Sequence, residues 1–282
     1  MEKWIVEESE SSLSLVAFIR SRSKKTLSSR NIKQMLENNS CLVNGSKERF
    51  GSRKLEKGDS VSCESFFYQT QKASFNSSRI LFEDEHILAY NKTPDIDVYE
   101  LEKQLKGPKL VHRLDKDTTG VLLFSKTEKS HKNLLQAFAD REIQKEYLTL
   151  VYGKPKAKEG RISCSLEKKV QIEGQVIWGI SKKGKEAVTD WKLLKTIKNV
   201  SLLRCYPKTG RTHQIRIHLV HLGHPVLGDS QYGRYLQKPF IQVNRHILHA
   251  ESLHFLHPIS RKNISIRAEI PEDFMCFGFF VK

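Results

Sequence analysis

The first sixty residues carry a pattern of apolar and polar positions that predicts a small unit of helices and short strands. Residues 14–22, SLVAFIRSR, place apolar side chains at helical spacing, and residues 28–39 predict a second helix. Residues 41–48, CLVNGSKE, predict a short strand that enters an Asn-Gly turn. Residues 54–63 predict a further turn and strand. We expect this unit to span residues 1–63.

The pattern changes after this unit. Residues 64–78 are rich in Ser, Gln and Asn without periodicity and predict a linker. From residue 79 onward strands dominate, which favours an α+β fold with a mixed, mainly antiparallel sheet over residues 79–282. Strands are expected within residues 79–92 (two strands), 109–114, 120–126, 145–153, 187–195 and 200–207, and helices within residues 129–142 and 212–223.

Composition changes this picture in one respect. The chain of 282 residues has 48 basic and 32 acidic side chains, a net charge of +16, which favours a polyanionic partner and first of all nucleic acid. The acidic amino terminus predicts no signal or transit peptide, and no apolar run approaches the roughly 18 residues of a membrane span. Five widely spaced cysteines fit reduced thiols, so we expect a cytoplasmic protein without membrane contact.

The segment HRLDKDTTG, residues 112–120, allows three interpretations. A calcium loop is excluded because the twelfth position counted from Asp115 is Lys126 and apolar residues fill the space between. A plain turn between two strands and a role for Asp115 in chemistry both remain open. The histidines of THQIRIHLVHLGH lack an HExxH pattern and a carboxylate within the helix, so no metal site is expected there.

Several separate segments resemble one family. HRLDKDTTG, KEYLTLVYG, TGRTHQIRIHLVHLGHPVLGD, HILHAESLHFLHP and the late IPEDF resemble, in this order, the RluA family of pseudouridine synthases. The first motif usually reads HRLDxxTSG and differs here by Thr119. The resemblance spans residues 79–275 and disfavours the plain-turn interpretation of Asp115. One departure is TPDIDVYELEKQLKGPK, where the family commonly has NKPAG and a loop, so the 93–110 loop is atypical.

The resemblance implies an enzyme that isomerises uridine to pseudouridine in RNA without a cofactor or metal. It makes Asp115 the catalytic carboxylate, acting either as a nucleophile or as the base that removes a ribose proton. It places three substrate-binding side chains around it: Arg216 as the partner of the enclosed carboxylate, Arg113 holding the flipped-out nucleotide, and Tyr147 stacking on the base. Arg216 lies beside the apolar face of its helix, so we expect its guanidinium at the edge of the core.

The amino-terminal unit resembles the αL RNA-binding domain of ribosomal small-subunit protein four, because two basic helices precede VNG and KGDSV. Its expected RNA-binding residues are Arg20, Arg22, Lys24, Lys25, Arg30 and Lys33. Such a domain favours large-subunit ribosomal RNA as the substrate of a monomeric enzyme.

Three alternatives stand beside this prediction. One is a transfer-RNA pseudouridine synthase. Another is a non-catalytic ribosome-assembly protein on the same fold, which the intact Asp115, Tyr147 and Arg216 disfavour. The last is a metal-dependent nuclease, which no carboxylate cluster supports.

Overall fold

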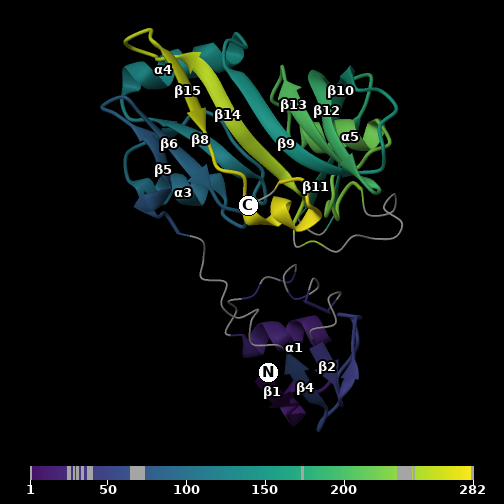
Figure 1. Cartoon of the computed structure of the whole chain (residues 1–282). Coiled ribbons are helices and arrows are strands. Elements are labelled where there is room, and N and C mark those ends of the chain that lie inside the picture. Colours follow the sequence, from purple (N-terminus) through teal and green to yellow (C-terminus); the bar gives the residue numbers. More distant parts are fainter. Residues whose placement is uncertain are drawn as a thin grey trace. The chain divides into compact units, whose positions relative to one another are not determined.

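The computed structural model of the chain describes residues 2–23, 27, 29, 32, 35–36, 41–63, 74–172, 175–233, 243 and 245–280 (Figure 1). The chain divides into two units, Met1–Lys72 and Ala73–Lys282, called here the smaller and the larger unit. The division falls within the segment expected to be a linker. Beyond it, the Phe75 ring already contacts Tyr90, with ring centroids 5.4 Å apart, and therefore belongs to the larger unit.

The smaller unit is a helix on a short antiparallel sheet with the strand order β1-β4-β2-β3. Its described elements are β1 Glu2–Ile5, α1 Leu15–Arg22, β2 Cys41–Val43, β3 Ser46–Lys47 and β4 Ser60–Cys63. The Ser14 side chain accepts a hydrogen bond from the Ala17 N–H and caps α1. Asn44 and Gly45 both have positive φ, as the two-residue hairpin turn predicted here requires. The expected second helix lies largely outside the described residues.

The larger unit is built on an eleven-stranded sheet whose main path runs β11-β10-β12-β13-β9-β14-β8-β6-β5. Strand β15 pairs with β14, and β7 pairs with β8. The strands are β5 Ile80–Glu83, β6 Ile87–Lys92, β7 Lys109–Leu110, β8 Thr119–Ser125, β9 Gln144–Tyr152, β10 Glu159–Ile172, β11 Gln175–Ile180, β12 Lys185–Ile197, β13 Val200–Pro207, β14 Leu248–Leu256 and β15 Asn263–Arg267. Among these, β8 and β14 form the one parallel pair, which confirms the α+β class with a mixed, mainly antiparallel sheet.

Three α-helices in the described part of this unit accompany the sheet: α3 Val98–Leu105, α4 Glu128–Ala139 and α5 Gln214–His221. Helix α4 packs near β8, and α5 packs against β11 and β12 on the other half of the sheet, with the long strands β9 and β14 between the two halves (Figure 1). Ile215 and Leu219 of α5 are buried in the core that also holds Tyr147, Trp191 and Leu203. No helix among the described residues is long and apolar enough to cross a membrane.

The strand expected over residues 109–114 is wrong beyond its first two residues. Strand β7 ends at Leu110, opposite Phe124. Leu123 precedes Phe124 on β8 and would face the next residue of a longer β7. Its N–H donates to the His112 side chain, at Nε2, with a distance of 2.9 Å. Burial and the nearby Lys145 lower the pKa of His112 to about 3, so its imidazole is neutral and can accept. This side chain replaces the backbone ladder and turns the chain away from the sheet.

Gly120 is required where β8 meets β14. The two strands pair in parallel through Thr119 with His249 and Gly120 with Ala250. Gly120 has a φ of 110°, and a Cβ at this position would collide with the carbonyl group of Ala250. The glycine therefore allows the close approach that sets the position of the residues just before β8.

Gly120→Ala is expected to destabilise the larger unit severely, by more than about 4 kcal/mol, because backbone strain and a backbone collision add. The matched control is Gly223→Ala, which has a φ of 86° but nothing within 4 Å of the added Cβ. Strain alone should cost this control about 1 kcal/mol. Denaturant unfolding of both variants measures the difference, and equal losses would show that the contact with Ala250 is unimportant.

Candidate active site

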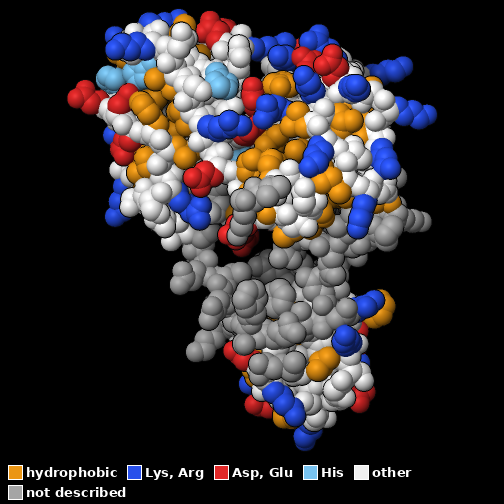
Figure 2. Space-filling model, in the orientation of Figure 1, with side chains coloured by type: hydrophobic (Ala, Val, Ile, Leu, Met, Phe, Trp, Pro, Cys, Tyr) orange, Lys and Arg blue, Asp and Glu red, His pale blue; other side chains and the backbone are white. Residues whose placement is uncertain are grey.

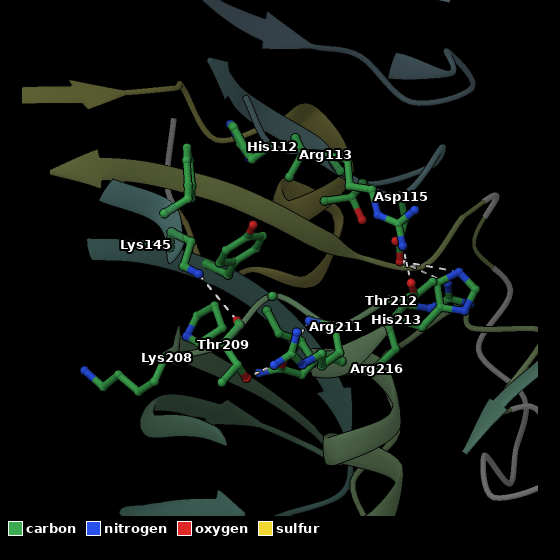
Figure 3. A pocket seen from close by; sticks show the side chains of 18 of the residues that line it. His112, Arg113, Asp115, Lys145, Lys208, Thr209, Arg211, Thr212, His213 and Arg216 are labelled. Carbon is green, nitrogen blue, oxygen red and sulfur yellow. Dashed lines mark hydrogen bonds and ion pairs between the residues drawn. The ribbon is translucent and has the colours of Figure 1, made fainter. Parts of the chain in front are cut away.

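A cavity of about 480 Å³ opens in the larger unit between several segments of the chain. Its walls come from residues 111–115 with Thr118, from residues 138–141 at the end of α4, from β9, from residues 207–216 and from Leu248 of β14. The four residues predicted to act on the substrate, Arg113, Asp115, Tyr147 and Arg216, all line it. Figure 3 shows Arg113, Asp115, His213 and Arg216 gathered at one end and Lys145 with Lys208 at the other. The structure thus brings together residues up to 103 positions apart in the sequence, from Arg113 to Arg216.

The Asp115 carboxylate is held through one of its two oxygens. Nη1 of Arg216 donates to Oδ2 at 3.2 Å, and Nε2 of His213 lies 3.9 Å from the same oxygen. The contacts of this carboxylate within the described residues all reach Oδ2. Because the side chain is 24% exposed, Oδ1 is accessible to a group that enters the cavity.

Arg216 is more deeply buried than the sequence predicted, with 5% of its surface exposed. The expectation of a guanidinium at the edge of the core is wrong, because a second carboxylate, Asp229, lies in the interior. Nε and Nη2 of Arg216 donate to the two oxygens of Asp229 at 2.7 and 2.9 Å. Burial disfavours the charged guanidinium, but the bonds to Asp229 and the charges of Asp229 and Asp115 outweigh this effect and raise the pKa of Arg216.

Asp229 is the main residue around Arg216 that the sequence analysis missed. It stands at the end of the quoted segment TGRTHQIRIHLVHLGHPVLGD, where a Gly-Asp pair reads as an ordinary turn. Its Oδ1 also accepts the backbone N–H groups of Gln231 and Tyr232, each at 3.1 Å. Asp229 therefore fixes Arg216 and the following turn together.

Two further cations hold the backbone that carries Asp115. Nζ of the buried Lys92 donates to the carbonyls of Thr93 and Lys116 at 2.8 and 2.7 Å. Nη1 of Arg245 donates to the carbonyl of Asp117 at 3.0 Å. Burial lowers the pKa of Lys92 to about 7. Both cations bind carbonyl oxygens, so they position the turn without pairing with the Asp115 carboxylate.

Tyr147 and Lys145 are two residues apart on β9 and both line the cavity. Burial, and secondarily the charge of Asp115, raise the pKa of Tyr147 above its ordinary value. The phenol therefore stays protonated at neutral pH, which suits a stacking surface better than a base. Burial, together with the charges of Arg141 and Lys208, lowers the pKa of Lys145 to about 8.

The start of α5 is fixed by Gln214. Its side-chain oxygen accepts from the Thr209 hydroxyl and the Arg211 N–H, and its amide donates to Val188 and Thr189 of β12. The helix begins two residues later than expected, at Gln214, because His213 has a φ of 55°. Arg113 is exposed and its guanidinium donates to the Thr212 hydroxyl, at the mouth of the cavity.

The predicted RNA-binding cations of the smaller unit are only partly described. Arg20 is exposed. Arg22 forms ion pairs with Glu10 at 2.7 Å and Glu7 at 3.2 Å. Lys24, Lys25, Arg30 and Lys33 lie outside the described residues. No three His, Cys, Asp or Glu side chains in the part of the chain that the structure describes are grouped as metal ligands.

Comparison with known proteins connects this fold and site to a class of RNA-modifying enzyme. Residues 77–221 match the family described as RNA pseudouridylate synthase. The chain is 34% identical over 260 residues to an uncharacterized RNA pseudouridine synthase of Helicobacter pylori, covering 89% of this chain and 95% of the relative. The chain therefore belongs to the RNA pseudouridylate synthase family, and the resemblance to the RluA type is confirmed.

Two further relatives carry more specific names. The chain is 35% identical over 221 residues to ribosomal large subunit pseudouridine synthase D of Zymomonas mobilis, covering 69% of each chain. It is 34% identical over 248 residues to ribosomal large subunit pseudouridine synthase C of Escherichia coli, covering 78% of each.

Solved structures of two human proteins share the fold. Human RNA pseudouridylate synthase domain containing 1 is 28% identical, with a TM-score of 0.58 over 67% of this chain and 82% of that chain. Human RNA pseudouridylate synthase domain containing 4 is 23% identical, with a TM-score of 0.59 over 70% of this chain and 90% of that chain.

Proposed function

We propose that this protein converts uridine to pseudouridine in large-subunit ribosomal RNA, with Asp115 as its catalytic carboxylate and no cofactor. The observation that carries the proposal is the enclosed Asp115, paired with the buried Arg216 in a cavity that Tyr147 also lines. The ribosomal substrate is supported by the two bacterial relatives whose names specify the large ribosomal subunit. Transfer RNA is the alternative substrate.

The chemistry needs a carboxylate beside the sugar. The bond between N1 of the base and C1′ of the ribose breaks, and C1′ then bonds to C5 of the same base. The proton on C5 is lost to solvent and N1 gains one, so the product is an isomer of the substrate. Cleavage develops positive charge at C1′, which Oδ1 of Asp115 can stabilise or attack. Removal of a proton from the neighbouring ribose carbon is the other route open to the same oxygen.

Tyr147 and Arg113 fit the binding of an unstacked nucleotide. Removing a base from a folded RNA costs a few kcal/mol, and stacking on an aromatic ring returns about 1–3 kcal/mol. Tyr147 contributes a neutral aromatic ring to the cavity, and Arg113 contributes an exposed cation at its mouth. Lys and Arg side chains also gather on the side of the larger unit that carries β10 to β13 (Figure 2). Cations there suit the phosphates of a folded RNA.

Asp115→Asn is expected to abolish the reaction while the RNA still binds, because both routes need the negative charge. RNA tritiated at C5 of uridine should release label to water with the unaltered protein and no added metal or nucleotide. Release should fall to background with Asp115→Asn, whose RNA affinity is measured in parallel.

The matched control for this experiment is Asp117→Asn. Asp117 is two residues away in the same turn and does not line the cavity, so label release should largely persist. Two results would show that the catalytic carboxylate is wrongly assigned. One is release of label by Asp115→Asn. The other is that Asp117→Asn, although folded, is the variant that loses label release while Asp115→Asn keeps it.

The choice of RNA is tested with two substrates in the same assay. Tritiated large-subunit ribosomal RNA should release label, and tritiated bulk transfer RNA should not. Mapping of the modified position then identifies the target uridine. Release from transfer RNA alone would replace the ribosomal proposal with its alternative.

Arg20 and Arg22 provide a matched pair for RNA binding by the smaller unit. Arg20→Ala should lower the slope of log K against log salt by about 1, because one phosphate contact is lost. Arg22→Ala should change the slope less, because Glu10 and Glu7 already neutralise Arg22. The slopes come from binding titrations at several salt concentrations. If neither slope changes, the smaller unit does not bind RNA through α1.

A further inference from the structure

His213 has a fixed orientation at the reacting end of the cavity. Its side chain is 18% exposed, and its backbone lies in the left-handed region that His, Asn and Asp tolerate best among residues with a Cβ. Nδ1 lies 2.7 Å from the Tyr232 hydroxyl, and Nε2 faces Oδ2 of Asp115 (Figure 3). Neither the sequence motifs nor the pairing of Arg216 assigns this imidazole a role.

The hydrogen bonds around Tyr232 favour the tautomer of His213 that carries its proton on Nε2. The backbone N–H of Trp178, on β11, donates to the Tyr232 hydroxyl oxygen at 3.1 Å. The hydroxyl hydrogen is then free to point at Nδ1 of His213, which accepts it. Burial lowers the pKa of His213 and so favours the neutral ring, whose one hydrogen is on Nε2 when Nδ1 accepts from Tyr232. The Nε2–H group therefore points toward the Asp115 carboxylate.

The distance between Nε2 of His213 and Oδ2 of Asp115 allows one bridging atom. The separation of 3.9 Å between Nε2 and Oδ2 is too long for a direct hydrogen bond. An oxygen placed about 2.8 Å from each atom would bond to both. This bridging group must accept a hydrogen bond from Nε2–H and donate one to a carboxylate. A hydroxyl group does both.

A uridine inside an RNA chain has one such group. Its 3′ and 5′ oxygens are esterified, the uracil carbonyls and the ring oxygen only accept, and N3–H only donates. The 2′-hydroxyl alone both accepts and donates. It is also attached to the carbon next to C1′, so a reaction at C1′ brings it beside Asp115.

We propose that His213 binds the ribose 2′-hydroxyl of the target uridine, with Nε2–H donating to the hydroxyl oxygen while the hydroxyl donates to Oδ2 of Asp115. The inference rests on the proposed function, since it requires a ribose at Asp115. It makes His213 a specificity-determining residue that distinguishes ribose from deoxyribose. Trp178 and Tyr232 are positioning residues that act through the imidazole.

The test compares two RNAs that differ only at the target position. Both are stem-loops of the RNA mapped above, one with uridine and one with 2′-deoxyuridine at that position. The deoxy RNA competes against release of label from the tritiated RNA, so its affinity is measurable whether or not it reacts. The quantity of interest is the preference for ribose within each protein, and general losses of active protein cancel from this ratio.

The unaltered protein should bind the ribose RNA more tightly than the deoxy RNA. In His213→Leu the ratio of the two affinities should be about fivefold smaller. His213→Gln keeps an N–H donor and carries the same backbone strain as the leucine variant, so it should retain more of the preference. Tyr232→Phe removes the hydrogen bond that fixes the tautomer and should lower the preference without changing the imidazole itself. Where a variant releases too little label, direct equilibrium binding of the two RNAs gives the same ratio.

An equal preference for ribose in the unaltered protein and in His213→Leu would overturn the inference, because His213 would then contact another part of the nucleotide or none. Absence of label release by the unaltered protein from any RNA would instead overturn the proposed function. The two failures are thus distinguishable.

Discussion

The site depends on one buried guanidinium shared between two carboxylates. Arg216 bonds to Asp229 through two nitrogens and to Asp115 through the third. Removing one partner of a buried ion pair typically costs 3–5 kcal/mol, roughly, because an uncompensated charge remains. Moving the guanidinium away from this position would therefore cost much free energy. Because the group is planar and rigid, its bonds to Asp229 also fix where it can bond to Asp115. Helix α5, the turn after residue 228 and the segment before β8 are thereby joined at one point.

The sequence was sufficient to predict much of the larger unit. Strands such as β9 and β13 are rich in apolar and aromatic residues, and the family resemblance predicted that Asp115, Tyr147 and Arg216 are neighbours in space. The central strand β14 was not predicted as a strand, because LHAESLHFL is buried nearly throughout and contains three polar residue types that disguise its period. Its His249 and Glu251 are buried, and His249 bonds to the Thr119 hydroxyl. Partners of this kind are supplied by other strands and leave no local pattern.

Other features escaped prediction for a related reason. The end of β7 is set by a side chain that accepts a backbone N–H, and the burial of Arg216 is set by Asp229 from a separate turn. Strand β1 forms by backbone pairing with β4, while three of its four side chains are exposed. Each of these outcomes depends on a contact between distant segments. Hydrophobic periodicity reports which side of an element is buried, and it does not report which polar group will be its partner.

The cations around the turn at Asp115 have two kinds of partner, the backbone of the turn and the Asp115 carboxylate. Lys92 and Arg245 lie close to this turn, yet they bond to carbonyl oxygens of residues 116 and 117. Arg245 also forms an ion pair with Asp273, with its Nε 2.6 Å from Oδ2. Burial brings the pKa of Lys92 to about 7, which reduces its average positive charge at neutral pH. Arg216, whose charge is mostly engaged by Asp229, is then the principal cation at the Asp115 carboxylate. The backbone is fixed by strong donors, while one oxygen of the Asp115 carboxylate stays outside these bonds, as the proposed reaction at the sugar requires.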